Sequence, residues 1–89
     1  METELKPEYD NRKSFYKKAV VIIEGEVLKL KSYNTIVCKI EMKNNRAVVY
    51  GTYSKTTLRH IKEFLKQNGY KADSQRQILE DYATTEIKI

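Results

Sequence analysis

Along the middle of the chain, apolar residues alternate with polar ones, which is the pattern of β-strands that bury one face. Gly25 lies between two glutamates, and Asn44-Asn45 follows a later alternating run; both are turn signals. The triplet Tyr33-Asn34-Thr35 interrupts the alternation and indicates a bulge or a corner. Short turns make consecutive strands antiparallel neighbours. The predicted strands cover residues 19–23, 27–32, 36–42 and 47–53, with Gly51 in the last strand indicating a bulge or a close backbone approach.

After these strands the period changes to that of an amphipathic helix. Apolar side chains recur every three or four residues between positions 58 and 65, which places them on one helix face. Ser54 is a suitable N-cap, and Gly69 suits the left-handed residue that ends many helices. Ser74 indicates the start of a short second helix. Residues 85–89 alternate weakly and predict a short edge strand or a frayed end.

The fold class predicted from this order is α+β: an antiparallel sheet of about four strands packed on one main helix, with a short second helix. A chain of 89 residues is long enough for one domain with one core. Residues 15–89 are predicted to form that domain. Residues 1–14 mix charges of both signs and show no period, so we expect a flexible N-terminal arm.

The net charge of +5 is unevenly distributed. Residues 55–71 contain five cations and one anion, whereas residues 73–89 contain two cations and four anions. A positive helix beside an acidic segment favours anionic partners at one face. The chain has no long apolar run and begins with charged residues, so we expect neither a membrane span nor a secretory signal. Cys38 is the only cysteine, which is typical of a reducing cytoplasm.

The candidate binding surface lies on the predicted main helix and at the strand–helix corner before it. Cations recur there in steps of four, three and four, which places them on one helix face where they can follow a phosphate backbone. Free N–H groups of the first helical turn favour a phosphate or carboxylate, and tyrosines at the corner supply rings that stack on bases or anchor a protein partner. The alternative for the cations is an ordinary solvated helix face, whose positive charge Glu63 partly neutralises. The alternative for the first helical turn is ordinary N-terminal capping. The candidate residues are Tyr50, Tyr53, Lys55, Thr56, Thr57, Arg59, Lys62 and Lys66.

Catalysis and metal binding have little support in the sequence. His60 is the only histidine, and it has neither a second ligand at metal-site spacing nor a nucleophile that it would serve as a base. Cys38 occupies an inward strand position between apolar neighbours, which is typical of a small core residue. We therefore predict a protein that is not an enzyme, with no catalytic residue, no metal and no cofactor.

Two motifs carry a resemblance to a known family. The first is SYNTIV at residues 32–37, and the second runs from Tyr53 to Gly69, with YSKTTLRHI followed by FL and G. In these motifs the chain resembles a family of small, functionally uncharacterised proteins from phages and mobile elements of low-GC Gram-positive bacteria. The pattern of that family resembles SYxTxV, then YSxTTxRHIxxFLxxxG. The likeness covers about residues 22–70 and implies a phage or plasmid context inside a bacterial host, without an activity to transfer.

These observations predict a small non-enzymatic binding protein of phage or mobile-element origin. It would act in the host cytoplasm on a protein or ribonucleoprotein complex that handles nucleic acid, by analogy as an inhibitor of host defence of the anti-CRISPR type. The alternative is a direct nucleic-acid-binding module that uses the basic helix face and the tyrosines. A third, weaker hypothesis is a small enzyme or ligand sensor with an anion site at Thr56-Thr57. The sequence leaves the target and the oligomeric state open.

Overall fold

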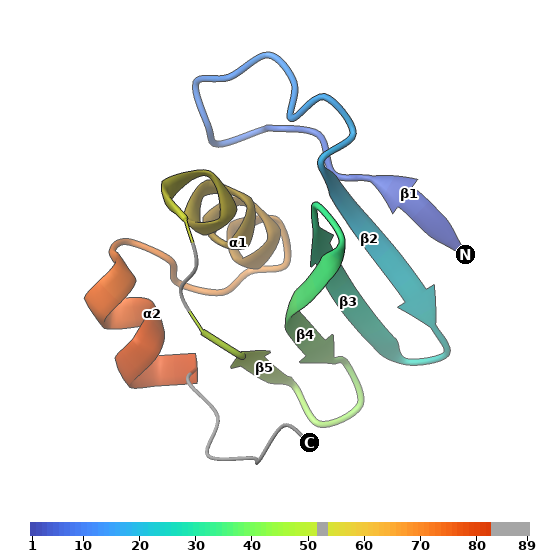
Figure 1. Cartoon of the computed structure of the whole chain (residues 1–89). Coiled ribbons are helices and arrows are strands. Elements are labelled where there is room, and N and C mark those ends of the chain that lie inside the picture. Colours follow the sequence, from blue (N-terminus) through green and yellow to red (C-terminus); the bar gives the residue numbers. More distant parts are fainter. Residues whose placement is uncertain (52–53, 83–89) are drawn as a thin grey trace.

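The computed structural model describes residues 1–51 and 54–82, and in this part of the chain five strands are followed by two helices. The five described strands form one sheet, and both helices lie on the same side of it (Figure 1). The strands are β1 (Glu2–Glu4), β2 (Ala19–Glu24), β3 (Val27–Ser32), β4 (Thr35–Glu41) and β5 (Arg46–Val49), and the helices are α1 (Lys55–Gln67) and α2 (Gln75–Tyr82). This arrangement confirms the predicted α+β class, with one strand more than the sequence indicated.

The sheet is an antiparallel meander in the order β1-β2-β3-β4-β5. A row of apolar side chains crosses it, because Val21 pairs with Leu30, Leu30 with Cys38, and Cys38 with Val49. These side chains pack in the core with Phe64 of α1. The alternation seen in the sequence therefore places apolar side chains on the face of the sheet that packs against the helices.

Two interruptions of the strand pattern have clear structural causes. Gly25 has a φ of 60° in the turn that joins β2 to β3, a left-handed conformation that glycine adopts easily. Tyr33 has a φ of 57° in the turn that joins β3 to β4. The register between these two strands shifts at Leu30/Lys31. The interruption at residues 33–35 is therefore a corner, and the bulge is at Val37 of β4, just after it and opposite Leu30/Lys31.

The last predicted strand is shorter in the structure than the sequence indicated. The prediction covered residues 47–53, but β5 ends at Val49. Gly51 consequently follows the strand and is not inside it. Residues 52–53 and the predicted edge strand at 85–89 lie outside the described part of the chain.

The N-terminal segment requires a correction, because it contributes both a strand and a core residue. Thr3 of β1 pairs with Val21 of β2. Leu5 of this segment is 3% exposed and belongs to the hydrophobic core, as does Phe15, the first residue of the predicted domain. We expected an arm outside the domain because residues 1–14 show no period, and a strand of three residues is too short to show one.

Both ends of α1 lie where the sequence indicated. The Oγ atom of Ser54 accepts an N–H of the first turn at 3.1 Å. At the other end Gly69 has a φ of 84°, and its N–H donates to the carbonyl of Lys66. The N–H of Tyr70 donates to the carbonyl of Leu65, which completes a Schellman ending.

The second helix, α2, begins after Ser74, as predicted. The Oγ atom of Ser74 accepts the N–H of Gln77 at 3.2 Å. Ile78 is fully buried and ties α2 to the core. Within the described residues, neither helix has the length and apolar character needed to cross a membrane.

Candidate functional site

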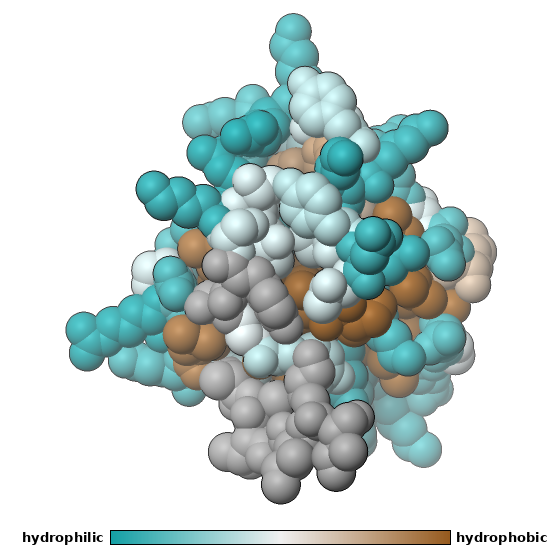
Figure 2. Space-filling view, viewed as in Figure 1, coloured by the Kyte–Doolittle hydropathy of each residue, from teal (hydrophilic) through white to brown (hydrophobic). Residues whose placement is uncertain are grey.

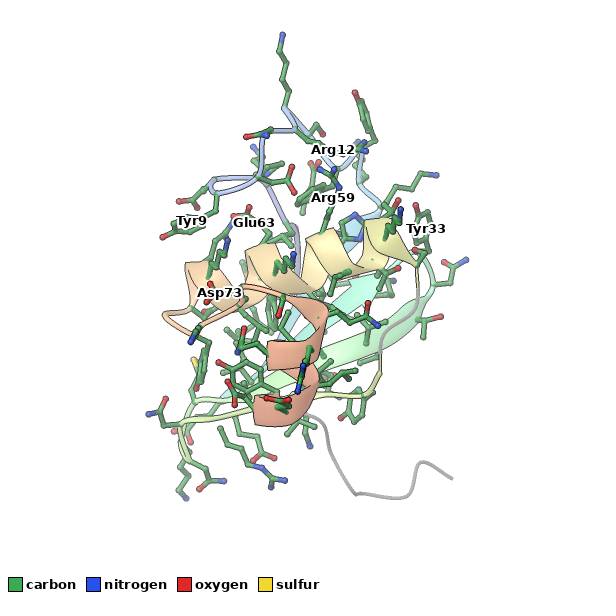
Figure 3. The ribbon with its side chains drawn as sticks, turned by 90° about the vertical axis from the view of Figure 1, so that its left-hand side faces the viewer. Tyr9, Arg12, Tyr33, Arg59, Glu63 and Asp73 are labelled. Carbon is green, nitrogen blue, oxygen red and sulfur yellow. The ribbon has the colours of Figure 1, made fainter. Side chains whose placement is uncertain are left out.

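A loop formed by residues 6–18, here the N-terminal loop, lies along α1 and is tied to it by one buried carboxylate (Figure 3). Glu63 of α1 is only 1% exposed. Its two oxygens accept the backbone N–H groups of Glu8 at 2.9 Å, Tyr9 at 3.0 Å and Asp10 at 2.9 Å. Consecutive N–H groups that converge on an anion form a binding nest, and here the anion is a side chain of the same protein.

Two further contacts hold the N-terminal loop on α1. The Nε2 atom of Gln67 donates both to Glu63 and to the carbonyl of Lys6, each at 2.6 Å. Arg59 forms an ion pair with Asp10 at 3.2 Å, and the side chain of Asp10 is 13% exposed. Glu63 and Asp10 are therefore both engaged within the protein: Glu63 accepts backbone N–H groups, and Asp10 pairs with Arg59, so neither carboxylate forms an ion pair with Lys62 or Lys66.

The N-terminal loop adds cations near the predicted cations of α1: Arg12 lies close to Arg59 (Figure 3), and Arg12 and Lys18 border a cavity with Thr56 of the first helical turn. Lys62 and Lys66 border a hollow of about 50 Å³ together with Arg59, Tyr9 and the two engaged carboxylates, Asp10 and Glu63. Figure 2 shows hydrophilic side chains gathered over the upper part of the molecule, where Figure 1 places the loop. We define the basic face as Arg12 and Lys18 of the N-terminal loop with Lys55, Arg59, Lys62 and Lys66 of α1.

Three exposed tyrosines accompany this basic face. Tyr9 is 60% exposed, Tyr16 is 73% exposed and Tyr33 is 47% exposed. Figure 3 shows Tyr9, Arg12, Arg59 and Tyr33 along the same side of α1. Of the two tyrosines predicted to bind, Tyr50 is half-buried after β5, and Tyr53 lies outside the described residues.

The sequence analysis missed the contribution of the N-terminal loop to this surface. Residues 9–18 read YDNRKSFYKK, in which two tyrosines alternate with four cations. That interleaving of rings and positive charges is itself a nucleic-acid-binding signal. The segment was set aside because it shows no strand or helix period.

The two residues of the predicted anion site, Thr56 and Thr57, occupy different environments in the structure. Thr56 is half-buried and lines a cavity, whereas Thr57 is 4% exposed and faces inward. The Oγ1 atom of Thr57 accepts the hydroxyl of Ser54 at 3.2 Å and lies 3.0 Å from the hydroxyl of Ser32. Thr57 therefore belongs to a buried hydrogen-bond chain and does not face solvent.

That chain continues to the only histidine. The Oγ atom of Ser32 lies 2.8 Å from Nδ1 of His60, and His60 is 1% exposed. Because Thr57 accepts from Ser54, its own hydroxyl is available to Ser32, and Ser32 can then donate to Nδ1. With Ser32 as the donor to Nδ1, the proton of neutral His60 lies on Nε2. Burial lowers the pKa of His60 below its usual value, a direction that Arg12 reinforces and Asp10 opposes.

A cavity of about 190 Å³ lies between the N-terminal loop and the first turns of α1. His60 and Phe15 contribute to its inner part, and their rings meet edge to face at 4.7 Å between centroids. The cavity is also bordered by Arg12, Tyr16, Lys18, Tyr33 and Thr56. The two motifs singled out in the sequence therefore meet here, because Ser32 and Tyr33 come from the first and Thr56, Thr57 and His60 from the second.

Metal-ligating side chains do not gather among the described residues, where no group of three or more His, Cys, Asp or Glu side chains is placed to hold an ion. Cys38 is fully buried on β4, and burial raises the pKa of its thiol. A further hollow beside α2 is bordered by Gln75, Arg76, Leu79 and Glu80, all from one helix. These side chains form no convergent polar cluster, and the basic face remains the best candidate surface.

Comparison with known proteins places the chain in a family. A family model matches residues 3–80, which includes every element from β2 to α1. The chain belongs to DUF8033, a family of unknown function. No curated protein and no solved structure matches it. The family description carries no activity, so the resemblance to phage and mobile-element proteins stays a prediction, and function is argued from geometry.

Proposed function

We propose that the protein binds single-stranded nucleic acid through the basic face and its exposed tyrosines. One observation carries the proposal: three exposed tyrosine rings lie among six cations, while Asp10 and Glu63 are engaged internally. A chain with a net charge of +5 that carries six of its 17 cations on this face has the electrostatic footprint of a nucleic-acid-binding protein.

The chemistry of the two residue types is complementary on a single strand. Lysine and arginine neutralise phosphates and release counterions, which gives affinity without sequence preference. Tyrosine rings stack on bases, and each base stacked in this way contributes about 1–3 kcal/mol. Stacking requires bases that are already unpaired, so rings exposed at a loop and a turn favour a single strand over a duplex. The proposed function needs no catalytic residue, metal or cofactor.

The test is a binding titration of a fluorescent single-stranded oligonucleotide, followed by anisotropy. Lys55, Lys62 and Lys66 are changed together to glutamate, and Arg59 is retained because its ion pair with Asp10 holds the N-terminal loop. We expect this triple variant to lose binding. The salt dependence of the wild type should have a log–log slope of about −0.7 for each phosphate contacted.

The matched control reverses three exposed cations away from the basic face: Lys43, Lys71 and Arg76. This variant has the same net charge as the first and should keep most of the affinity. Equal loss in both variants would mean that the overall charge, and not this face, governs binding. A wild type without measurable affinity at low salt would contradict the proposal.

The exposed tyrosines also support a second candidate, the inhibitor expected from the phage-like motifs. In that case the same face would bind a host protein or ribonucleoprotein complex that handles nucleic acid, because tyrosines commonly anchor protein interfaces. The two candidates separate in one experiment with purified components. An inhibitor should form a stable complex with one host factor while the isolated protein shows only weak affinity for oligonucleotides. Truncation of Tyr9 or Tyr33 should then disrupt that complex.

A further inference from the structure

The cavity beside His60 combines aromatic walls with positive charge at its rim. Tyr16 and Tyr33 both border it, and Arg12 and Lys18 stand at its opening. Its volume of about 190 Å³ equals the space of roughly six water molecules at about 30 Å³ each, which is the scale of one planar ring with its substituents. A group that is both flat and attached to an anion fits this combination.

The inner end of the cavity offers a hydrogen-bond donor of defined position. Nδ1 of His60 is engaged by Ser32, which leaves the Nε2 edge for the cavity that the residue lines. When the hydroxyl chain from Ser54 through Thr57 to Ser32 donates to Nδ1, neutral His60 carries its proton on Nε2. The imidazole therefore presents an N–H to an acceptor on whatever group enters.

The backbone around the cavity is held in an unusual conformation before any ligand arrives. Tyr16, Lys17 and Tyr33 have φ values of 53°, 62° and 57°, in the left-handed region that non-glycine residues rarely adopt. The N–H of Tyr33 donates to the carbonyl of Lys18 at 2.7 Å, which joins the loop side of the cavity to the β3–β4 turn. Residues held in such conformations cluster at ligand-binding sites, because the surrounding contacts pre-organise them.

We infer that this cavity receives one unstacked base of a bound single strand, with the phosphate next to that base held by Arg12 and Lys18. The inference rests on the proposed function and makes it more specific. The base lies against Tyr33 and Tyr16, and His60 donates from Nε2 to an acceptor on the inserted nucleotide. The ammonium group of Lys18 now lies 5.7 Å from the centroid of the Tyr33 ring. It moves from the ring to the phosphate as the base enters.

The test compares two oligonucleotides of equal length and charge: an oligothymidylate and its abasic counterpart. Because His60 is the only histidine, its imidazole signals in an NMR spectrum report on the cavity without site-specific labelling. We expect both strands to bind through their phosphates. Only the strand with bases should shift the His60 signals, and it should bind at least about tenfold more tightly, as expected from the stacking of one base.

Four variants locate the effect. Tyr33→Ala should reduce the affinity difference between the two strands, whereas Tyr33→Phe should keep it because the ring remains. Tyr16→Ala repeats the test at a residue that is 73% exposed, so the change should disturb folding little. Tyr9→Ala tests a binding tyrosine of the other hollow: this change should weaken binding but leave the His60 shift of the bound protein intact.

The outcomes separate the cavity from the function on which it depends. Equal affinities for the two strands, or an unshifted His60 in the complex with oligothymidylate, would overturn the insertion of a base and leave the basic face as the binding surface. Absence of binding by both strands would instead reject the proposed function itself. Retention of the affinity difference in both Tyr33→Ala and Tyr16→Ala would also exclude this cavity.

Discussion

The carboxylate of Glu63 accepts the backbone N–H of Tyr9 through both of its oxygens, at 3.0 Å and 3.2 Å, between residues 54 positions apart in the chain. This contact joins the middle of α1 to the N-terminal loop. It withdraws the only acidic side chain of α1 from the surface, where the sequence alone would place it among the lysines. The positive charge of the helix and the rings of the loop consequently share one face.

Glu63→Ala should destabilise the protein by about 2–3 kcal/mol, because three N–H groups lose an ionised acceptor. Glu63→Gln keeps one acceptor oxygen and should cost less. Urea unfolding measures both changes, and hydrogen exchange should show faster exchange at Tyr9 and Asp10. Glu8→Gln is the control for charge, since that side chain is exposed. Equal stability of Glu63→Ala and the control would show that the nest contributes nothing.

Gly69→Ala should lower stability by about 1–2 kcal/mol, the cost of a left-handed conformation for a residue with a Cβ. No atom lies within 4 Å of the position that a Cβ would occupy, so the effect comes from the backbone and not from a clash. Gly69→Asn should cost less, because asparagine tolerates this conformation better. Thermal unfolding of both variants checks the prediction, and an unchanged melting temperature for Gly69→Ala would contradict the Schellman ending.

Stability should fall as the pH drops below about 6.5, because burial lowers the pKa of His60 in the folded state. Between the folded pKa and the unfolded value near 6.5 the unfolded chain binds more protons, so acid favours unfolding. Above that window the contribution is fully present. Urea melts between about pH 5 and pH 7.5 should show this loss, and His60→Asn, which does not titrate, should flatten it. Parallel pH profiles for the two proteins would assign the effect to other groups.

Cys38 should be unreactive in the native protein. It is fully buried, and burial raises the pKa of its thiol, so the reactive thiolate is not formed at neutral pH. A colorimetric disulfide reagent should label Cys38 rapidly in concentrated urea and only at the rate of unfolding in native buffer. Fast native labelling would mean that β4 opens locally, since the buried thiol has no other route to the reagent.

The local elements could be predicted because their signals are carried by neighbouring residues. Ser54 and Gly69 mark the ends of α1 through one side-chain oxygen and one left-handed backbone, and both act within a turn of their own position. Gly25 marks its hairpin in the same way. In the strands, the alternation of apolar and polar residues was sufficient to predict which face packs against the core. Fold class therefore followed from the sequence.

Only the tertiary structure decided the composition of the candidate site. Glu63 either lies exposed among the cations of the basic face or is buried beneath a loop. The outcome depends on residues 8–10, which lie more than fifty positions away and show no period. Thr57 could have faced solvent as part of the helix cap. Its hydroxyl instead forms a hydrogen bond with Ser32, which in turn contacts His60. Such contacts depend on backbone N–H groups and single hydroxyls, which every sequence offers in many places. Their partners are selected only when the chain closes on itself and each buried polar group must find one.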